Sequence, residues 1–115
     1  MDIKDLKQYE TTNRKILKIQ QERKELNKKH LAILKEEEKI LSKMQRNETF
    51  MCYVVEDTKA IAEIKKLYKM SFKENAEEQK TLRALIKESQ TVITDITNEL
   101  KRIEKYKKGI RKNAK

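Results

Sequence analysis

The side chains best suited to nucleophilic or metal chemistry are too few in this sequence to form a catalytic site. The chain has one histidine, His30, and one cysteine, Cys52. A cysteine nucleophile needs a base close by, and a structural zinc site needs about four Cys, His or carboxylate ligands. We therefore expect His30 to take a polar position on a helix and Cys52 to be a small buried apolar residue.

The acidic cluster Glu36-Glu37-Glu38 is the nearest approach to a cation site. Successive residues of an α-helix point about 100° apart, so three carboxylates in a row do not converge on one ion. We expect a solvated face that forms ion pairs with neighbouring lysines. The single glycine, Gly109, rules out a glycine-rich phosphate loop. The sequence thus predicts no enzyme, no metal site, no cofactor and no small-molecule substrate.

Basic side chains gather in a tail over residues 101–115, which carries eight basic residues and one acidic residue, net +7 of the chain's +10. Such a tail can bind an acidic protein, nucleic-acid phosphates or an anionic membrane surface, can direct nuclear import, or can only raise solubility. Tyr106 is its one aromatic residue, which disfavours base stacking. We favour an acidic partner, with phosphate as the alternative ligand. The contact residues would be Lys101, Arg102, Lys105, Lys107, Lys108, Arg111 and Lys112.

The composition predicts an all-α protein that presents these groups on long helices. There is one glycine and no proline, 42% of the residues are charged, and the 37% that are hydrophobic recur periodically. Few turn-forming residues and a helical period favour solvated helices over strands or disorder. We expect one domain over 1–115: a long antiparallel helical hairpin, or an elongated three-helix bundle, with coiled-coil heptads.

The first helix is predicted over residues 2–46, with Asp2 as its cap. Its fully apolar heptad row is expected to be the core row, while the row three residues earlier is mostly polar and would set register or partner choice. Leu34 and Leu41 widen the stripe. The apolar row is Ile19, Leu26, Ile33 and Ile40, and the companion row is Ile16, Arg23, His30, Glu37 and Met44.

A turn is predicted at 47–50 and a second helix over 51–112. The apolar run Phe50–Val55 could be a short strand, but no partner strand is visible and we favour the start of the second helix. Ser71 and Glu74 match a capping box, so a break near 70–76 stays open. One heptad row crosses that gap in phase: Val54, Ile61, Tyr68, Asn75, Leu82, Ser89, Ile96, Ile103 and Ile110.

These features favour a non-enzymatic coiled-coil adaptor or assembly subunit, with a protein partner or a homo-oligomer. The alternative is a helical protein that binds nucleic acid through phosphates, without reading its sequence. Six apolar residues at the end of a hairpin cannot all face a narrow helical contact, so Phe50–Val55 is predicted to be a contact site. The expected protein interface comprises Phe50, Tyr53, Val54, Leu82, Leu85, Ile86, Val92, Ile93 and Ile96.

Nothing in the sequence predicts a membrane segment or a secretory signal. No apolar run approaches about 18 residues, and the first residues lack an apolar stretch. The lone cysteine gives no intramolecular disulfide, which mildly favours a reducing compartment. We expect an intracellular protein, cytoplasmic or nuclear, that is unlikely to bind membranes.

Overall fold

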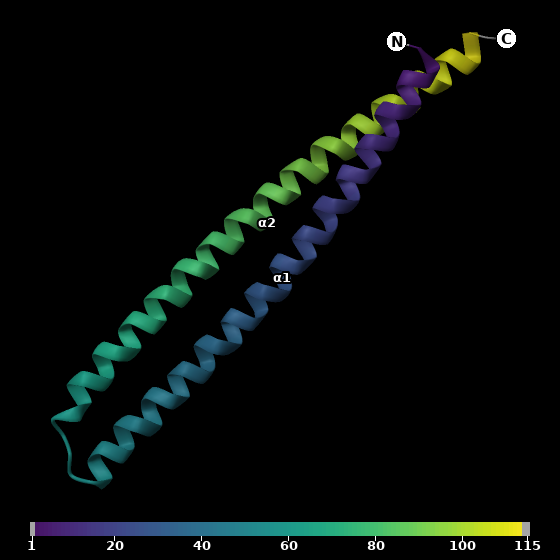
Figure 1. The fold of residues 1–115 in the computed structure, drawn as a ribbon. Coiled ribbons are helices and arrows are strands. Elements are labelled where there is room, and N and C mark those ends of the chain that lie inside the picture. The colour runs from purple at the N-terminus through teal and green to yellow at the C-terminus, as the bar shows by residue number, and fades with distance from the viewer. Residues whose placement is uncertain (1, 114–115) are drawn as a thin grey trace. The chain divides into compact units, whose positions relative to one another are not determined.

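The protein consists of two long α-helices (Figure 1). The computed structural model describes residues 2–113, and the side chains of all of these except 111–113. Helix α1 spans Ile3–Val54, 52 residues, and α2 spans Ala60–Asn113, 54 residues. The described residues contain no strand. The all-α prediction is therefore confirmed, and the alternative of a strand at Phe50–Val55 is excluded.

The turn lies at 55–59, later than the predicted 47–50, because the apolar run closes α1 and does not open α2. The end of α1 has the hydrogen bonds of a Schellman motif. The amide of Asp57 donates to the carbonyl of Cys52 at 2.9 Å, and that of Glu56 to the carbonyl of Tyr53 at 3.2 Å. Glu56 takes the left-handed conformation that this motif requires, with a φ of 59°. Backbone bonding that the residue types did not signal thus decides where the chain reverses.

Both helices are continuous over their whole described length. At the start of α1, the Leu6 amide donates to the Asp2 carbonyl at 3.0 Å, as expected if Asp2 is the cap. The hydroxyls of Thr11 and Thr12 donate to carbonyls one turn earlier, both at 2.9 Å. Helix α2 shows no break near 70–76. Of the two arrangements left open, the structure has the continuous second helix.

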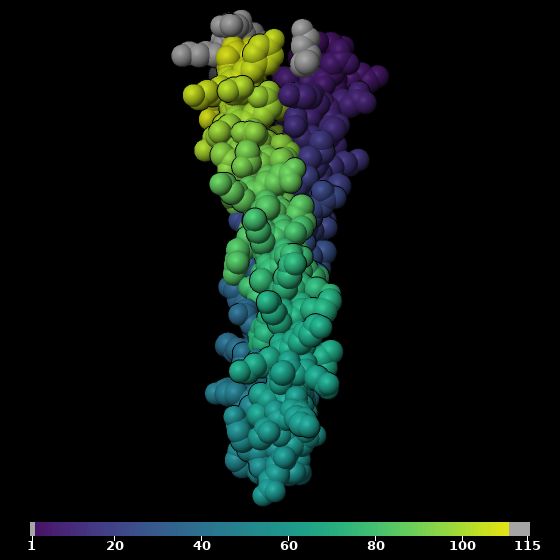
Figure 2. Space-filling model, turned by 90° about the vertical axis from the view of Figure 1, so that its left-hand side faces the viewer, coloured from purple at the N-terminus to yellow at the C-terminus, as the bar shows by residue number. Residues whose placement is uncertain are grey.

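The contacts divide the chain into two units. Unit 2, Lys28–Ala84, is a hairpin of the second half of α1, the turn and the first half of α2. Unit 1 pairs Met1–Asn27 with Leu85–Lys115. In unit 1 the first turns of α1, purple, lie against the last turns of α2, yellow (Figures 1 and 2). Within each unit the two helical segments are antiparallel.

The α1 row predicted as the core is exposed. Ile33 is 64% exposed, whereas its neighbour Leu34 is 4% exposed. The face of α1 that meets α2 is a second row, displaced by one residue and therefore by about 100° around the helix. We call the exposed residues Ile16, Ile19, Leu26, Ile33, Ile40 and Met44 the outer row. The inner row comprises Leu6, Glu10, Asn13, Leu17, Gln20, Lys24, Asn27, Leu31, Leu34, Leu41, Gln45, Thr49 and Cys52, all buried or half-buried.

The row predicted for α2 does face α1. Tyr68, Leu82 and Ile103 are buried, and so are the polar members Asn75 and Ser89. Ile61, Ile96 and Ile110 are half-buried, and Val54 lies at the end of α1 and is exposed. In α2 the most apolar row and the contact row coincide, whereas in α1 they are different rows.

Candidate protein-binding surfaces

The outer row of α1 is a surface without a partner in this chain. In unit 1, Leu26 is 65% exposed and Ile19 is 53% exposed. In unit 2, Ile33, Ile40 and Met44 are exposed in the same way. Single exposed apolar residues are common, but a heptad series of them along one side of a helix is the pattern by which helices pair. The outer row is therefore a candidate protein contact in each unit.

The end of the hairpin in unit 2 exposes apolar side chains nearly all round. Phe50, Met51, Tyr53, Val54 and Val55 are all between 53% and 65% exposed. Only Cys52 in this run is buried, as predicted for it. The predicted interface residues Phe50, Tyr53 and Val54 are thus open to a partner.

The predicted interface residues of α2 already face α1. Leu82 is buried in unit 2. In unit 1, Ile86, Val92, Ile93 and Ile96 are half-buried, and Leu85 is 40% exposed. Apart from the exposed Leu85, these residues, predicted as a protein interface, pack on α1 of the same chain.

A buried polar cluster holds α1 and α2 together in unit 2. The Asn75 amide donates to the Leu34 carbonyl at 3.0 Å, and the Gln79 amide donates to the Glu38 carboxylate at 2.7 Å. Gln79 also bonds Asn75, and Arg83 donates to Gln79 at 3.1 Å. Among the described residues, no buried side-chain polar atom lacks a partner. Asn75 was visible in the sequence as a polar residue in an apolar row, but nothing there singled out Gln79.

A second polar contact in unit 2 joins Tyr68 and Glu48. The Tyr68 hydroxyl bonds the Glu48 side chain, and burial of the ring, followed by this bond, raises the pKa of Tyr68 above its ordinary 10.0. Glu48 lies on α1 and Tyr68 on α2, so this contact also joins the two helices of unit 2.

In unit 1, Glu10 is the centre of the polar contacts. Its carboxylate accepts from Lys107 on α2 and pairs with Arg14 at 3.0 Å. The hydrogen bond from Lys107 first, and then that from Arg14, lowers the pKa of Glu10 below its ordinary 4.5. Lys24 bonds Gln90, and the Tyr9 hydroxyl donates to Glu99 at 3.2 Å. Polar α1 side chains thus face the apolar row of α2 in unit 1.

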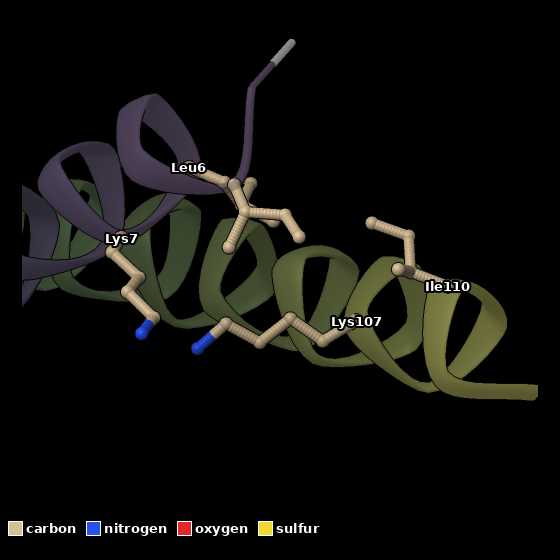
Figure 3. A pocket seen from close by; sticks show the side chains of 5 residues that line it. Leu6, Lys7, Lys107 and Ile110 are labelled. Atoms are coloured by element: carbon tan, nitrogen blue, oxygen red, sulfur yellow. The ribbon is translucent and has the colours of Figure 1, made fainter. Parts of the chain in front are cut away.

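Three hollows open where the ends of α1 and α2 meet in unit 1. One, of about 260 Å³, has apolar walls of Ile3, Leu6 and Ile110 with Lys7 and Lys107 at its edge. In Figure 3 the two lysine side chains extend to the same side of this hollow. A second, of about 390 Å³, is lined by Leu6, Tyr9, Glu99, Arg102, Ile103 and Tyr106. Both are small, and their walls combine apolar side chains with a few polar ones.

The third hollow, of about 400 Å³, is basic. Lys101, Lys105 and Lys108 line it and are exposed, and no ion pair is found for them among the described side chains. Arg102 instead pairs with Glu99 at 3.2 Å, and Lys107 with Glu10. The remaining predicted tail contacts, the side chains of Arg111 and Lys112, lie outside the described residues. Among the described side chains, the tail lysines thus divide into Lys107, which pairs with Glu10 within unit 1, and three that face solvent.

The few side chains that the sequence offered for nucleophilic or metal chemistry do not form a common site in the described residues. His30 is exposed, at the edge of the contact between the two helices, with its Nε2 3.2 Å from Oε1 of Glu78 on α2. Glu36, Glu37 and Glu38 are all exposed. The described residues contain no group of three or more His, Cys, Asp or Glu placed to hold a metal ion. Neither described helix has an apolar stretch long enough to span a membrane.

Comparison with known proteins supplies no relative for this chain. No protein family matches it, and no curated protein or solved structure is significantly similar to it. The case for its function therefore rests on the surfaces described above.

Proposed function

We propose that this chain is a non-enzymatic coiled-coil adaptor or assembly subunit that binds other proteins through the apolar surface of α1. The exposed outer row carries the proposal. Helix α1 turns polar side chains such as Glu10 and Lys24 towards α2 and leaves Leu26 and Ile33 in solvent. Burying apolar area is worth about 25 cal/mol per Å². A partner helix that covers the outer row would therefore gain binding free energy from apolar area that this chain leaves in solvent.

The geometry of α1 also supports more than one helical partner. Its inner and outer rows are displaced by one residue, and therefore by about 100° around the helix. A helix in a bundle of three or four contacts two neighbours in roughly this way, whereas a two-stranded coiled coil needs one seam. Helix α2 occupies the inner row, and the proposed partner occupies the outer one.

The experiment is affinity purification of the tagged chain from its native cells, followed by mass spectrometry, with two substitutions compared. Leu26→Asp places a charge in the outer row, and Ala32→Asp makes the same change in charge at an exposed position outside both rows. We expect the Ala32→Asp chain to retain the partners of the native chain and the Leu26→Asp chain to lose them. Equal recovery with both variants would contradict the outer row as the interface.

In the same proposal, the basic tail docks to an acidic surface of the partner. Lys101, Lys105 and Lys108 follow one another at four- and three-residue spacing and line one groove. Replacing all three by Gln should abolish the docking, while replacing them by Arg should preserve it. The reason is that the acidic surface of the partner recognises positive charge and not the shape of the lysine side chain. Binding to the purified partner at two salt concentrations tests this, and failure of the Arg variant would instead indicate a specific lysine geometry.

The same three exposed lysines favour a second candidate, binding to nucleic-acid phosphates. The net charge of +7 over 101–115 would attract the phosphates electrostatically. Phosphate binding by lysines falls steeply with salt because counterions are released. A salt series against duplex DNA and duplex RNA separates the candidates: tight binding at low salt with a steep loss supports nucleic acid, and no binding at low salt supports the adaptor.

A further inference from the structure

We propose that a second copy of this chain occupies the outer row of α1 in unit 2, antiparallel to the first and related to it by a two-fold axis near residue 42. The inference rests on the proposed function, in which the outer row is a protein contact, and it names the partner for one part of that row. From His30 to Val54 the row continues with the same heptad spacing through Met51, which is 53% exposed. The polar residues Glu37 and Asn47 within this row determine which partner helix fits, because they need polar residues opposite them.

The surface extends from α1 onto α2 within the hairpin. His30, at the edge of the contact between the two helices, lies 3.2 Å from Glu78 of α2, which marks the side of α2 that adjoins the outer row. Leu67 precedes Glu78 by about three helical turns and so lies on that side. Leu67 is 68% exposed. Helix α2 of unit 2 therefore also exposes a large apolar side chain on the side of a helix docked on the outer row.

Antiparallel self-pairing matches the chemistry of this row position by position. If Ile40 lies opposite Met44 of the second copy, then Ile33 lies opposite Met51, because residue numbers rise on one helix as they fall on the other. Glu37 is exposed, and its Oε1 accepts from the Asn75 amide of the same chain at 3.5 Å. It then lies opposite the exposed Asn47, whose amide can donate to the other carboxylate oxygen, Oε2. Between Ile33 and Met51 the polar residues meet each other and the apolar residues meet each other, while at each end of the contact His30 lies opposite Val54.

Other arrangements of two copies lose this match. A shift by one heptad in either direction places the Glu37 carboxylate against Ile40 or against Val54, a charge against an apolar side chain. Parallel pairing in register places Glu37 against Glu37, and like charges in a helical contact are destabilising. A polar residue in an otherwise apolar row is the usual means by which helical pairs fix register and orientation.

Charge also favours the second copy at this segment. The whole chain carries +10, of which +7 lies in residues 101–115, so pairing through the basic end would repel a copy of the chain. Residues 30–54 carry four basic and four acidic side chains and have no net charge. One like-charged contact remains: Lys43 flanks the two-fold axis and faces Lys43 of the second copy. Salt that screens this pair should therefore tighten the dimer, the opposite of its effect on binding by the tail.

Sedimentation equilibrium of the full chain over a wide concentration series tests the dimer. We expect a monomer–dimer equilibrium that Ile40→Asp weakens at least about tenfold, since the two-fold repeats the substitution in two layers. Ala32→Asp, with the same charge change outside both rows, should leave it unchanged, and both variants should keep the native helix content. A monomer at every concentration, or equal weakening by both substitutions, would overturn the proposal.

Disulfide trapping tests the orientation without relying on the stability of a variant. Ile40→Cys and Met44→Cys are introduced separately in a Cys52→Ala background, and the two chains are mixed under mild oxidation. We expect the mixed disulfide between residues 40 and 44 to exceed both symmetric ones, and a predominance of 40–40 or 44–44 disulfides would overturn the antiparallel pairing. If the chain is monomeric but Leu26→Asp still abolishes the capture of partners from cells, the dimer is refuted and the adaptor function stands. If the chain dimerises but captures no other protein, the adaptor function is refuted and the dimer stands.

Discussion

The two units differ in what α1 brings to its contact with α2. In unit 1, α2 supplies apolar residues such as Ile96 and Ile103, and the contact row of α1 is mostly polar, with Glu10 and Lys24 among its members. In unit 2 both helices supply buried apolar residues, Leu34 from α1 and Leu82 from α2, and the buried polar residues Asn75 and Gln79 lie on α2. In both units α1 leaves an apolar row in solvent, so exposure of this row does not depend on how polar the contact row of α1 is.

The largest effect should separate neighbouring residues of α1 in unit 2. Leu34→Asp should destabilise unit 2 by about 4 kcal/mol, because it buries an unpaired charge at a position only 4% exposed. Ile33→Asp, at a position 64% exposed, should change stability by less than about 0.5 kcal/mol. Urea unfolding followed by circular dichroism at low protein concentration measures both. Similar losses for the two variants would mean that the inner and outer rows are wrongly assigned.

The corresponding pair in unit 1 should give a smaller difference. Ile96 is half-buried on the α2 row, so Ile96→Asp should cost about 2–3 kcal/mol. Ile19→Asp, at an outer-row position 53% exposed, should be nearly neutral. Loss of amide-exchange protection in 1–27 and 85–113 would locate the first effect. If Ile96→Asp leaves the melting temperature unchanged, the apolar row of α2 does not face α1 in solution.

A still smaller effect is expected at the turn, which only unit 2 has. Glu56 adopts a φ of 59°, which costs an L-residue about 1–2 kcal/mol and a glycine little. Glu56→Gly should therefore stabilise unit 2 by about 0.5–1 kcal/mol after the added freedom of the unfolded chain is subtracted. The control is Val55→Gly, where φ is not positive and the same substitution should destabilise. A loss of stability with Glu56→Gly would argue against the Schellman end of α1.

The smallest effect should be the pH dependence of unit 1. Because Lys107 and Arg14 lower the pKa of Glu10, its ionised form is favoured in the folded chain. The contribution of Glu10 to the free energy of unfolding is therefore present above the ordinary pKa of 4.5. It is lost as the pH falls through the lower pKa of the folded chain. Glu10→Gln should cost at most about 1 kcal/mol at pH 7 and almost nothing below the folded pKa. Stability curves of the two chains that stay parallel from pH 7 into the acid range would exclude the linkage.

Sequence periodicity alone determined the helical class and the contact row of α2. One glycine, no proline and apolar residues in heptad phase leave little besides long helices. In α2 the row through Tyr68, Leu82 and Ile103 is both the most apolar and the buried one, so counting apolar residues identified it. The start of the first helix next to Asp2 followed in the same way from a local preference that acts within one turn.

Only the tertiary structure decided which row of α1 meets α2 and where the chain reverses. The row with the most isoleucine, through Ile33 and Ile40, is exposed, and a row rich in Asn, Gln and Glu is covered. That choice depends on partners on the other helix, such as Lys107 for Glu10 and Gln79 for Glu38, which lie far away in sequence. The turn depends on backbone hydrogen bonds around Glu56. Because glutamate rarely adopts a positive φ, this residue type does not predict the left-handed conformation. Periodicity reports which faces of a helix are apolar, but pairing between distant residues decides which of those faces the chain covers with itself.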